Sequence, residues 1–493
     1  MKRILPGLLV LVMLSACVHS HKPLSYNGMS LTVDGCQSSN TTSAQQAILE
    51  HGLRSQVKFA DENEPLYSIA EQLTAHQIPA LSVAVIDAGR IAWTGIYNSG
   101  GSTLNCDSLF QAASLSKPVT LMAVVRMHSE GLIDMDKDIQ AYLEHQVLPQ
   151  GLQTTENPVT FRNLLGHTSG ITPGGYEGYA QGEMLPSDVE VLTGAAGVNS
   201  PAIEVVAVPN EQLMYSGGAY TLAELALQDV FNDTFSNIMK RWILQPLEMG
   251  IADFSQPLPA IKSSQAAQGH DMNGAVVPGG WRNHPEQAAA GLWSNASDLA
   301  KFLIEMHHAY QGGGKLFTQR DIELLLNGER HGQAYGFIIN RTDTSVAITH
   351  FGGNVGYRTG MTIDLVSGDG LVYLTNSDSG GNLGNELLYA ASQIYDWQHF
   401  KQTTVKRAQV ETQVLKGLSG DYTWNQQVDL QVKYDESVKQ IALYFPNGDA
   451  YQLVPITGEA LDFIHAETGV RVAFDPEDGL QSFLLYGQQA VKK

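Results

Sequence analysis

The chain has 493 residues, of which 43% are hydrophobic and only 16% charged, and its formal net charge is −21 (29 Lys and Arg against 50 Asp and Glu). A length of this order predicts two or three domains with large cores, and so low a charged fraction argues against a disordered chain. Because the negative surplus would repel phosphate backbones and no Lys/Arg cluster offsets it, we expect no nucleic-acid partner.

The N-terminus has the layout of a secretory signal peptide. Two basic residues precede an apolar stretch over 4–14, which is too short to cross a bilayer. The sequence Leu14-Ser15-Ala16-Cys17 resembles the lipobox of bacterial lipoproteins; the alternative is an ordinary cleaved signal with an incidental cysteine. The resemblance implies a signal peptide over 1–16 and an acylated Cys17. Val18 after it favours the outer membrane, so a lipid-anchored protein of the bacterial cell envelope, on the periplasmic face, is expected.

Two further cysteines follow the lipobox. In an exported protein Cys36 and Cys106 could form a disulfide, worth about 4 kcal/mol in the loop-entropy model, or both could be buried thiols. Residues 17–60 contain the polar run Ser38-Ser39-Asn40-Thr41-Thr42-Ser43 and are expected to form an N-terminal tether.

The folded body is expected to begin just after residue 60. Apolar residues at helical spacing over 66–73 predict a first helix. Two pairs of β-rich runs, each around a Gly-containing turn, predict hairpins: 81–86 with 91–96, and 360–366 with 371–374. Strands at both ends of a region with helices between them predict an α+β domain over 61–404, with one antiparallel sheet packed between helices.

The pattern changes from about residue 405. Val428, Leu430 and Val432 alternate with polar residues, and turn sequences separate short strand-like runs. Residues 405–493 are therefore predicted to form a small all-β domain, a barrel or a sandwich.

The segment around Ser114 carries the clearest chemical signal. Ser114 and Lys117 are three residues apart, so on a helix they lie on one face within hydrogen-bonding reach, and the apolar run 121–125 predicts a buried helix behind them. A serine hydroxyl is a weak nucleophile until a base takes its proton, and a partly desolvated lysine can help to do so. On these residues alone, Ser114 is either a nucleophile or a helix cap.

The Ser-x-x-Lys spacing is weak evidence by itself, since a chain of this size should contain about one match by chance. A second match, Ser55-Gln56-Val57-Lys58, has no apolar helix behind it and is interpreted as that chance match.

Four later segments strengthen the interpretation of Ser114 as a nucleophile: Val159-Thr160-Phe161-Arg162-Asn163-Leu164-Leu165-Gly166-His167-Thr168-Ser169-Gly170, Tyr215-Ser216-Gly217-Gly218-Ala219-Tyr220, Ala290-Gly291-Leu292-Trp293-Ser294-Asn295-Ala296-Ser297-Asp298-Leu299 and His350-Phe351-Gly352-Gly353. In this order they resemble class C β-lactamase-like serine hydrolases, a family that includes penicillin-binding D,D-peptidases, D-aminopeptidases and some esterases. The resemblance covers about residues 65–400, and the region after 405 is similar to a small β-domain often appended to these proteins. It implies a β-lactamase or D,D-peptidase-like fold and an acyl-enzyme mechanism without a cofactor.

The resemblance also implies a role for each matching residue. Ser114 would be the acylated nucleophile, Lys117 its proton partner and Tyr215 the general base, its phenolate favoured by the nearby ammonium. The backbone N–H groups of Ser114 and Gly353 would form the oxyanion hole, and His350 would position the substrate or share protons. The alternative for Tyr215 is a core aromatic residue.

The remaining histidines carry weaker signals. His167 suggests a Ser–His pair, but a turn residue bonded to backbone is the preferred interpretation. No His-Glu-x-x-His or comparable spacing occurs, so no metal is expected.

Two motif positions depart from β-lactamases. Gly217 stands where an Asn is usual, and His350 stands where a Lys is usual; Arg358-Thr359-Gly360, a rival match to the third motif, lies too far along its strand. Both departures weaken β-lactam hydrolysis specifically.

The sequence therefore predicts a lipid-anchored serine hydrolase that cleaves amide or ester bonds of a small-molecule or peptide substrate, of the D,D-peptidase, D-aminopeptidase or esterase type. The alternatives are a class C-like β-lactamase and a catalytically poor cell-wall-binding protein that uses the same cleft. The sequence gives no prediction of the oligomeric state.

Overall fold

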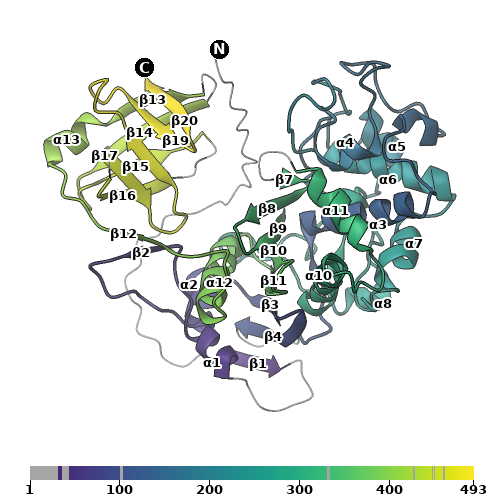
Figure 1. Cartoon of the computed structure of the whole chain (residues 1–493), viewed down its shortest axis with the longest axis horizontal. Helices are drawn as coiled ribbons and strands as arrows, with labels where there is room; N and C mark the ends of the chain where they lie inside the picture. Colours follow the sequence, from purple (N-terminus) through teal and green to yellow (C-terminus); the bar gives the residue numbers. More distant parts are fainter. Residues whose placement is uncertain are drawn as a thin grey trace. The chain divides into compact units, whose positions relative to one another are not determined.

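The computed structural model describes residues 31–35, 44–99, 104–329, 333–425, 428–446, 448, 450–458 and 461–493. The predicted signal peptide, Cys17 and Cys36 lie outside these residues. The described chain forms two compact units: the larger contains β1, the start of α1 and residues 70–380, and the smaller contains residues 47–69 and 381–493 (Figure 1).

The larger unit is built on one antiparallel sheet of eight strands in the order β1-β4-β3-β11-β10-β9-β8-β7. The strands are β1 (Leu31–Gly35), β3 (Ala80–Asp87), β4 (Arg90–Ser99), β7 (Gln333–Ala334), β8 (Phe337–Arg341), β9 (Val346–Asn354), β10 (Tyr357–Asp364) and β11 (Gly370–Thr375). Both predicted hairpins are present, and Val85 of β3 pairs with Leu371 of β11. The prediction that distant segments close one antiparallel sheet is confirmed.

Helices and short strands complete the larger unit. They are α2 (Ile69–Ala75), β5 (Phe110–Gln111), η1 (Ala113–Leu115), α3 (Ser116–Ser129), η2 (Ile139–Tyr142), α4 (Phe161–Leu165), α5 (Asp188–Thr193), α6 (Gly217–Phe231), α7 (Phe235–Met239), η3 (Lys240–Leu244), α8 (Ala260–Ser263), α9 (Gln287–Ala290), β6 (Trp293–Ser294), α10 (Ala296–Tyr310) and α11 (Gln319–Asn327).

Two of these helices show how sequence pattern determines placement. The α3 residues from Val119 to Val125 are apolar apart from Thr120, and all are buried, as expected for a helix that is hydrophobic on all sides. The amphipathic α10 contacts β3, β4, β10 and β11 and thus covers one face of the sheet with Leu299, Phe302 and Met306.

The smaller unit contains a closed antiparallel barrel, which settles the prediction of a barrel or sandwich after residue 405. Its strands are β13 (Gly420–Trp424), β14 (Val428–Asp435), β15 (Gln440–Tyr444), β16 (Ala450–Ile456), β17 (Leu461–His465), β18 (Arg471–Phe474), β19 (Ser482–Leu485) and β20 (Gln488–Lys492). Side chains such as Tyr422, Phe463 and Phe474 form its core. The unit also has α12 (Gly380–Ile394), α13 (Thr412–Gly417) and the parallel pair β2 (Val57–Phe59) and β12 (Thr403–Val405).

The region expected to be a tether contains ordered elements. β1 pairs with β4 at the edge of the main sheet, α1 spans Ala44–Glu50, and β2 pairs with β12. Residues 31–35 and 57–59 are therefore part of the fold, because their backbones pair with strands that are distant in the sequence.

Cys106 is disulfide-bonded. Since Cys36 lies outside the described residues, the pairing of these two cysteines stays a prediction. In the described part of the chain, no helix has the length and apolar character of a transmembrane span.

Candidate active site

The candidate nucleophile lies at a sharp turn between β5 and α3. Ala113 has φ +52°, a left-handed conformation that is uncommon for a residue with a Cβ atom. It turns the chain so that Ser114, which is partly exposed, lies in η1 directly before α3. Backbone strain of this kind is concentrated at functional sites.

Lys117 brings the predicted residues together. It lies in the first turn of α3 with only 2% of its surface exposed. Its Nζ donates hydrogen bonds to Ser114 Oγ at 3.2 Å and to the Ala289 carbonyl at 2.7 Å, and it lies 4.9 Å from the centre of the Tyr215 ring. One buried ammonium therefore contacts the candidate nucleophile, a backbone acceptor and the candidate base.

The segment around α9 supports the nucleophile turn. The Leu292 N–H donates to Ser116 Oγ at 3.0 Å, and the Leu292 carbonyl accepts from the Ala112 N–H at 2.8 Å. The carboxylate of Glu224, on α6, accepts the Ala288 N–H at 2.7 Å. No sequence pattern indicated the roles of Ala289 and Glu224, because both depend on contacts between distant segments.

Tyr215 is held at the start of α6. It directly precedes Ser216, the N-cap of α6, whose hydroxyl accepts the Ala219 N–H at 2.9 Å. The ring of His167 lies 4.4 Å from the Tyr215 ring, and His167 Nδ1 accepts the Ser216 N–H at 3.1 Å. His167 thus has the backbone-bonded turn geometry that the sequence suggested, with φ +56°.

His350 and Gly353 lie on the part of β9 that extends beyond β8. β8 pairs with β9 over Val346–Thr349, so the part of β9 from His350 onward has no β8 partner in this register. β9 also contacts η1, which contains Ser114. A Cβ atom on Gly352 would lie 2.7 Å from the Ala112 carbonyl and 3.0 Å from the Ser114 nitrogen, so only glycine allows this approach. Gly353, the next residue, is exposed.

His350 is neutral at physiological pH. Burial, together with the positive charge of Lys117, lowers its pKa to about 3. It can therefore donate or accept a hydrogen bond, but it does not supply the positive charge that a lysine would at this position.

A family model described as Beta-lactamase matches residues 67–395, about two thirds of the chain. The chain belongs to the beta-lactamase family. This membership identifies it as a serine hydrolase and fits the serine-centred geometry described above.

Relatives and solved structures agree with the family. The chain is 23% identical over 404 residues to Penicillin-binding protein 4* of Bacillus subtilis (strain 168), covering 78% of this chain and 86% of that protein. The octameric penicillin-binding protein homologue from Pyrococcus abyssi has a TM-score of 0.55 at 19% identity, over 86% of this chain and 98% of that one. The D-amino acid amidase from Ochrobactrum anthropi SV3, complexed with D-phenylalanine, has a TM-score of 0.52 at 19% identity, over 66% and 97%.

The first departure from the β-lactamase motifs has a structural counterpart. A Cβ atom on Gly217 would lie 2.9 Å from Cε2 of the Tyr176 ring. The hydroxyl of Thr221 donates to the Tyr176 hydroxyl at 3.1 Å and so holds this ring in place. The aromatic ring therefore crowds the space that an asparagine side chain would enter.

The rejected match Arg358-Thr359-Gly360 lies on β10. Gly352 faces Ser114, whereas a Cβ atom on the next residue, Gly353, would lie 3.4 Å from Arg358 Nη1. Because successive strand residues point to opposite faces, Arg358 lies on the face away from Ser114, where it pairs with Asp378 at 2.8 Å.

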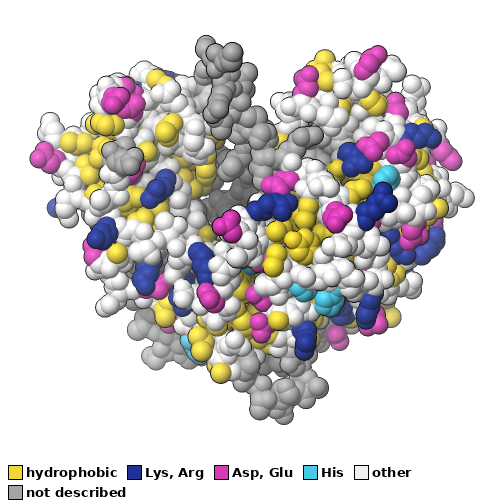
Figure 2. Space-filling model, in the orientation of Figure 1, with side chains coloured by type: hydrophobic (Ala, Val, Ile, Leu, Met, Phe, Trp, Pro, Cys, Tyr) yellow, Lys and Arg dark blue, Asp and Glu magenta, His cyan; other side chains and the backbone are white. Residues whose placement is uncertain are grey.

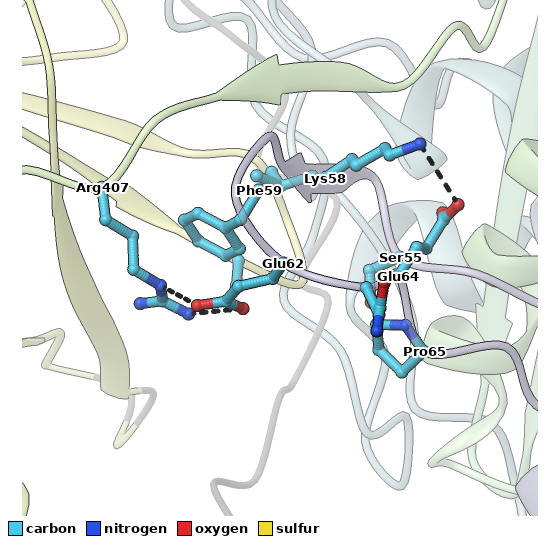
Figure 3. A pocket seen from close by; sticks show the side chains of 10 residues that line it. Ser55, Lys58, Phe59, Glu62, Glu64, Pro65 and Arg407 are labelled. Carbon is cyan, nitrogen blue, oxygen red and sulfur yellow. Dashed lines mark hydrogen bonds and ion pairs between the residues drawn. The ribbon is translucent and has the colours of Figure 1, made fainter.

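The second Ser-x-x-Lys match does not form a comparable pair. Lys58 lies on β2 rather than on a helix, and its ammonium is 3.9 Å from the Glu64 carboxylate in a pocket of the smaller unit that Ser55 also lines (Figure 3). Arg407 in the same pocket pairs with Glu62. The charged side chains of this pocket are thus bound to one another, which supports the interpretation of this match as chance.

The described residues show how surface charge and potential metal ligands are distributed. On the face shown in Figure 2, basic side chains are interspersed with acidic ones rather than gathered in one block. Within the described ranges, no group of three or more His, Cys, Asp or Glu side chains is placed to hold a metal ion.

Proposed function

We propose that the protein hydrolyses amide or ester bonds through an acyl-enzyme at Ser114. The observation that carries the proposal is the position of the buried Lys117 ammonium, 3.2 Å from Ser114 Oγ and 4.9 Å from the centre of the Tyr215 ring. This arrangement combines a nucleophile, a cation and a candidate base in one cluster.

In the proposed mechanism, Tyr215 as phenolate takes the proton of Ser114 while Oγ attacks the substrate carbonyl. The Lys117 ammonium stabilises the phenolate and the developing alkoxide. The N–H groups of Ser114 and Gly353 bind the oxyanion, where one donor commonly contributes about 3 kcal/mol. Tyr215 then protonates the leaving amine or alcohol and returns to the phenolate. In deacylation it takes a proton from water, which attacks the acyl carbonyl, and it gives that proton to Ser114 Oγ as the acid product leaves.

Peptidase, amidase or esterase activity is favoured over dedicated β-lactamase activity. The neutral His350 provides no cation for a substrate carboxylate, and Tyr176 crowds the position of the usual asparagine. The named relatives, a penicillin-binding protein and a D-amino acid amidase, support a small-molecule or peptide substrate.

The proposal includes the predicted location and domain limits. We infer acylation of Cys17 after removal of residues 1–16, which would anchor the protein in the bacterial envelope on the periplasmic face of the outer membrane. The limits 61–404 for the hydrolase domain and 405–493 for the β-domain belong to the same proposal. Replacing Cys17 by Ser should move the protein from the membrane fraction to the soluble fraction; a variant that stays with the membrane would contradict the anchor.

Labelling with a fluorophosphonate tests the catalytic proposal. The mature chain should gain one adduct by intact-protein mass spectrometry, peptide mapping should place it on Ser114, and Ser114→Ala should abolish it. Ser55→Ala is the matched control, because Ser55 belongs to the chance Ser-x-x-Lys match, and it should be labelled normally. A folded wild-type chain that stays unlabelled would favour the catalytically poor cell-wall-binding alternative.

A further inference from the structure

His167 makes three contacts around the candidate base. Its carbonyl accepts the Met214 N–H at 2.7 Å, its Nδ1 accepts the Ser216 N–H at 3.1 Å, and its ring lies 4.4 Å from the Tyr215 ring. The residues before and after Tyr215 are thus bonded to the same histidine, which also contacts the aromatic ring between them.

We propose that His167 is a positioning residue that holds Tyr215 against the Lys117 ammonium. The inference rests on the proposed function, in which Tyr215 is the base. His167 itself is not placed at the reacting atoms; it acts through the backbone on both sides of Tyr215 and through its ring.

The local structure fixes His167 from the other side. Thr160 and Asn163 form a capping box that starts α4, and the C-cap of α4 is Gly166, directly before His167. The hydroxyl of Tyr220 donates to the Leu165 carbonyl at 3.0 Å, and the Tyr220 ring lies 5.3 Å from His167. His167 is therefore an anchored part of the fold, 1% exposed, rather than a mobile turn.

The hydrogen bonds also determine the protonation state that the contact requires. Because the Ser216 N–H is a donor, Nδ1 must be unprotonated, so the neutral ring carries its proton on Nε2. Burial and the nearby Lys117 and His350 keep the pKa of His167 well below its usual value, in agreement with this tautomer.

Two substitutions separate positioning from mere stabilisation. His167→Ala removes both the acceptor and the ring. His167→Asn keeps an acceptor close to the position of Nδ1 and tolerates the left-handed backbone, but it removes the ring. His307→Ala is the control, because His307 is also a buried histidine with Nδ1 bonded to a backbone carbonyl, that of Leu365, and it lies on α10.

The experiment measures the rate of fluorophosphonate labelling of the mature chain as a function of probe concentration. His167→Ala should lower the maximal labelling rate about 100-fold, the cost of a misplacement of about 1 Å, with little change in half-saturating probe concentration. His167→Asn should stay within about 10-fold of the wild type, and His307→Ala should be unchanged.

Each result decides the inference. A folded His167→Ala that is labelled like the wild type, or a folded His167→Asn that is labelled as slowly as His167→Ala, overturns the positioning role alone. If His167→Ala does not fold, His167→Asn decides: labelling near the wild-type rate supports the role, and a loss of about 100-fold rejects it. If the wild type itself is not labelled, the proposed function fails and the inference fails with it.

Discussion

A buried carboxyl group behind the candidate active site gives a specific prediction for stability. Glu286 directly precedes α9, whose Ala289 carbonyl binds Lys117, and its side chain is fully buried. Neither carboxylate oxygen is hydrogen-bonded to another described residue. Burial, with the negative charge of Asp188 nearby, raises the pKa of Glu286 from 4.5 to about 8.

The direction in which pH changes the free energy of unfolding follows from proton binding by Glu286. Between pH 4.5 and about 8 the native state holds a proton that the unfolded chain releases, so the free energy of unfolding falls as the pH rises. The slope is up to about 1.4 kcal/mol per pH unit, which amounts to a loss of about 3 kcal/mol between pH 5 and pH 8. Glu286→Gln keeps the shape of the side chain and removes this dependence.

Urea unfolding followed by tryptophan fluorescence at pH 5, 6, 7 and 8 tests this prediction. The stability of Glu286→Gln relative to the wild type should increase with pH by about 3 kcal/mol over that range. Glu130→Gln is the control, because Glu130, the C-cap of α3, is exposed and pairs with Arg126 at the surface, and its effect should not change with pH in this way. A gain for Glu286→Gln that stays constant, or that falls with pH, would refute the buried neutral carboxyl.

Four further predictions concern the geometry around Ser114. Lys117→Met should lower the fluorophosphonate labelling rate at least about 100-fold in a folded protein, because the contacts with Ser114 Oγ and Tyr215 are lost; a smaller effect would exclude Lys117 as the proton partner. Gly352→Ala should slow labelling because its Cβ would lie 3.0 Å from the Ser114 nitrogen, whereas Gly250→Ala, with open space around it, should be neutral in the same assay. Gly217→Asn should lower the free energy of unfolding in urea by about 1–3 kcal/mol, because its side chain would clash with the Tyr176 ring. In a Tyr176→Ala background the same substitution should not have this cost; an equal cost in both backgrounds would show that the ring is not the obstacle. His350→Lys should increase the rate of acylation by a carboxylate-bearing β-lactam such as nitrocefin relative to the rate with a neutral p-nitrophenyl ester. Equal effects on the two rates would contradict the role of positive charge at position 350.

Local patterns predicted much of the fold. Alternating apolar runs around Gly-containing turns identified the hairpins β3–β4 and β10–β11, because both signals lie within a few residues. The edge strand β1 and the parallel pair of β2 and β12 were missed. Their runs are short, and their partners lie far away in the sequence, so only the assembled fold reveals them.

The site was predictable to a smaller extent. The spacing of Ser114 and Lys117 indicated their contact directly, since both lie within one turn. The roles of Tyr215 and His350 were predicted only from the family resemblance. Tyr215 directly precedes α6 and His350 lies on β9, so only the folded structure brings their segments close to Ser114. The hydrogen bond from Ser216 to His167 depends on side-chain packing, which no periodic pattern encodes.

Both departures from the β-lactamase motifs, at Gly217 and His350, change the side chains that would bind the substrate. At Gly217 an aromatic ring crowds the space of an amide side chain, and at position 350 a neutral imidazole stands where an ammonium is usual. The first exchange removes an amide side chain and the second removes a positive charge, while the contacts among Ser114, Lys117 and Tyr215 are kept. Because the proposed acyl transfer depends on those contacts and substrate choice depends on the surrounding groups, the two departures change which substrates fit the site rather than the proposed chemistry at Ser114.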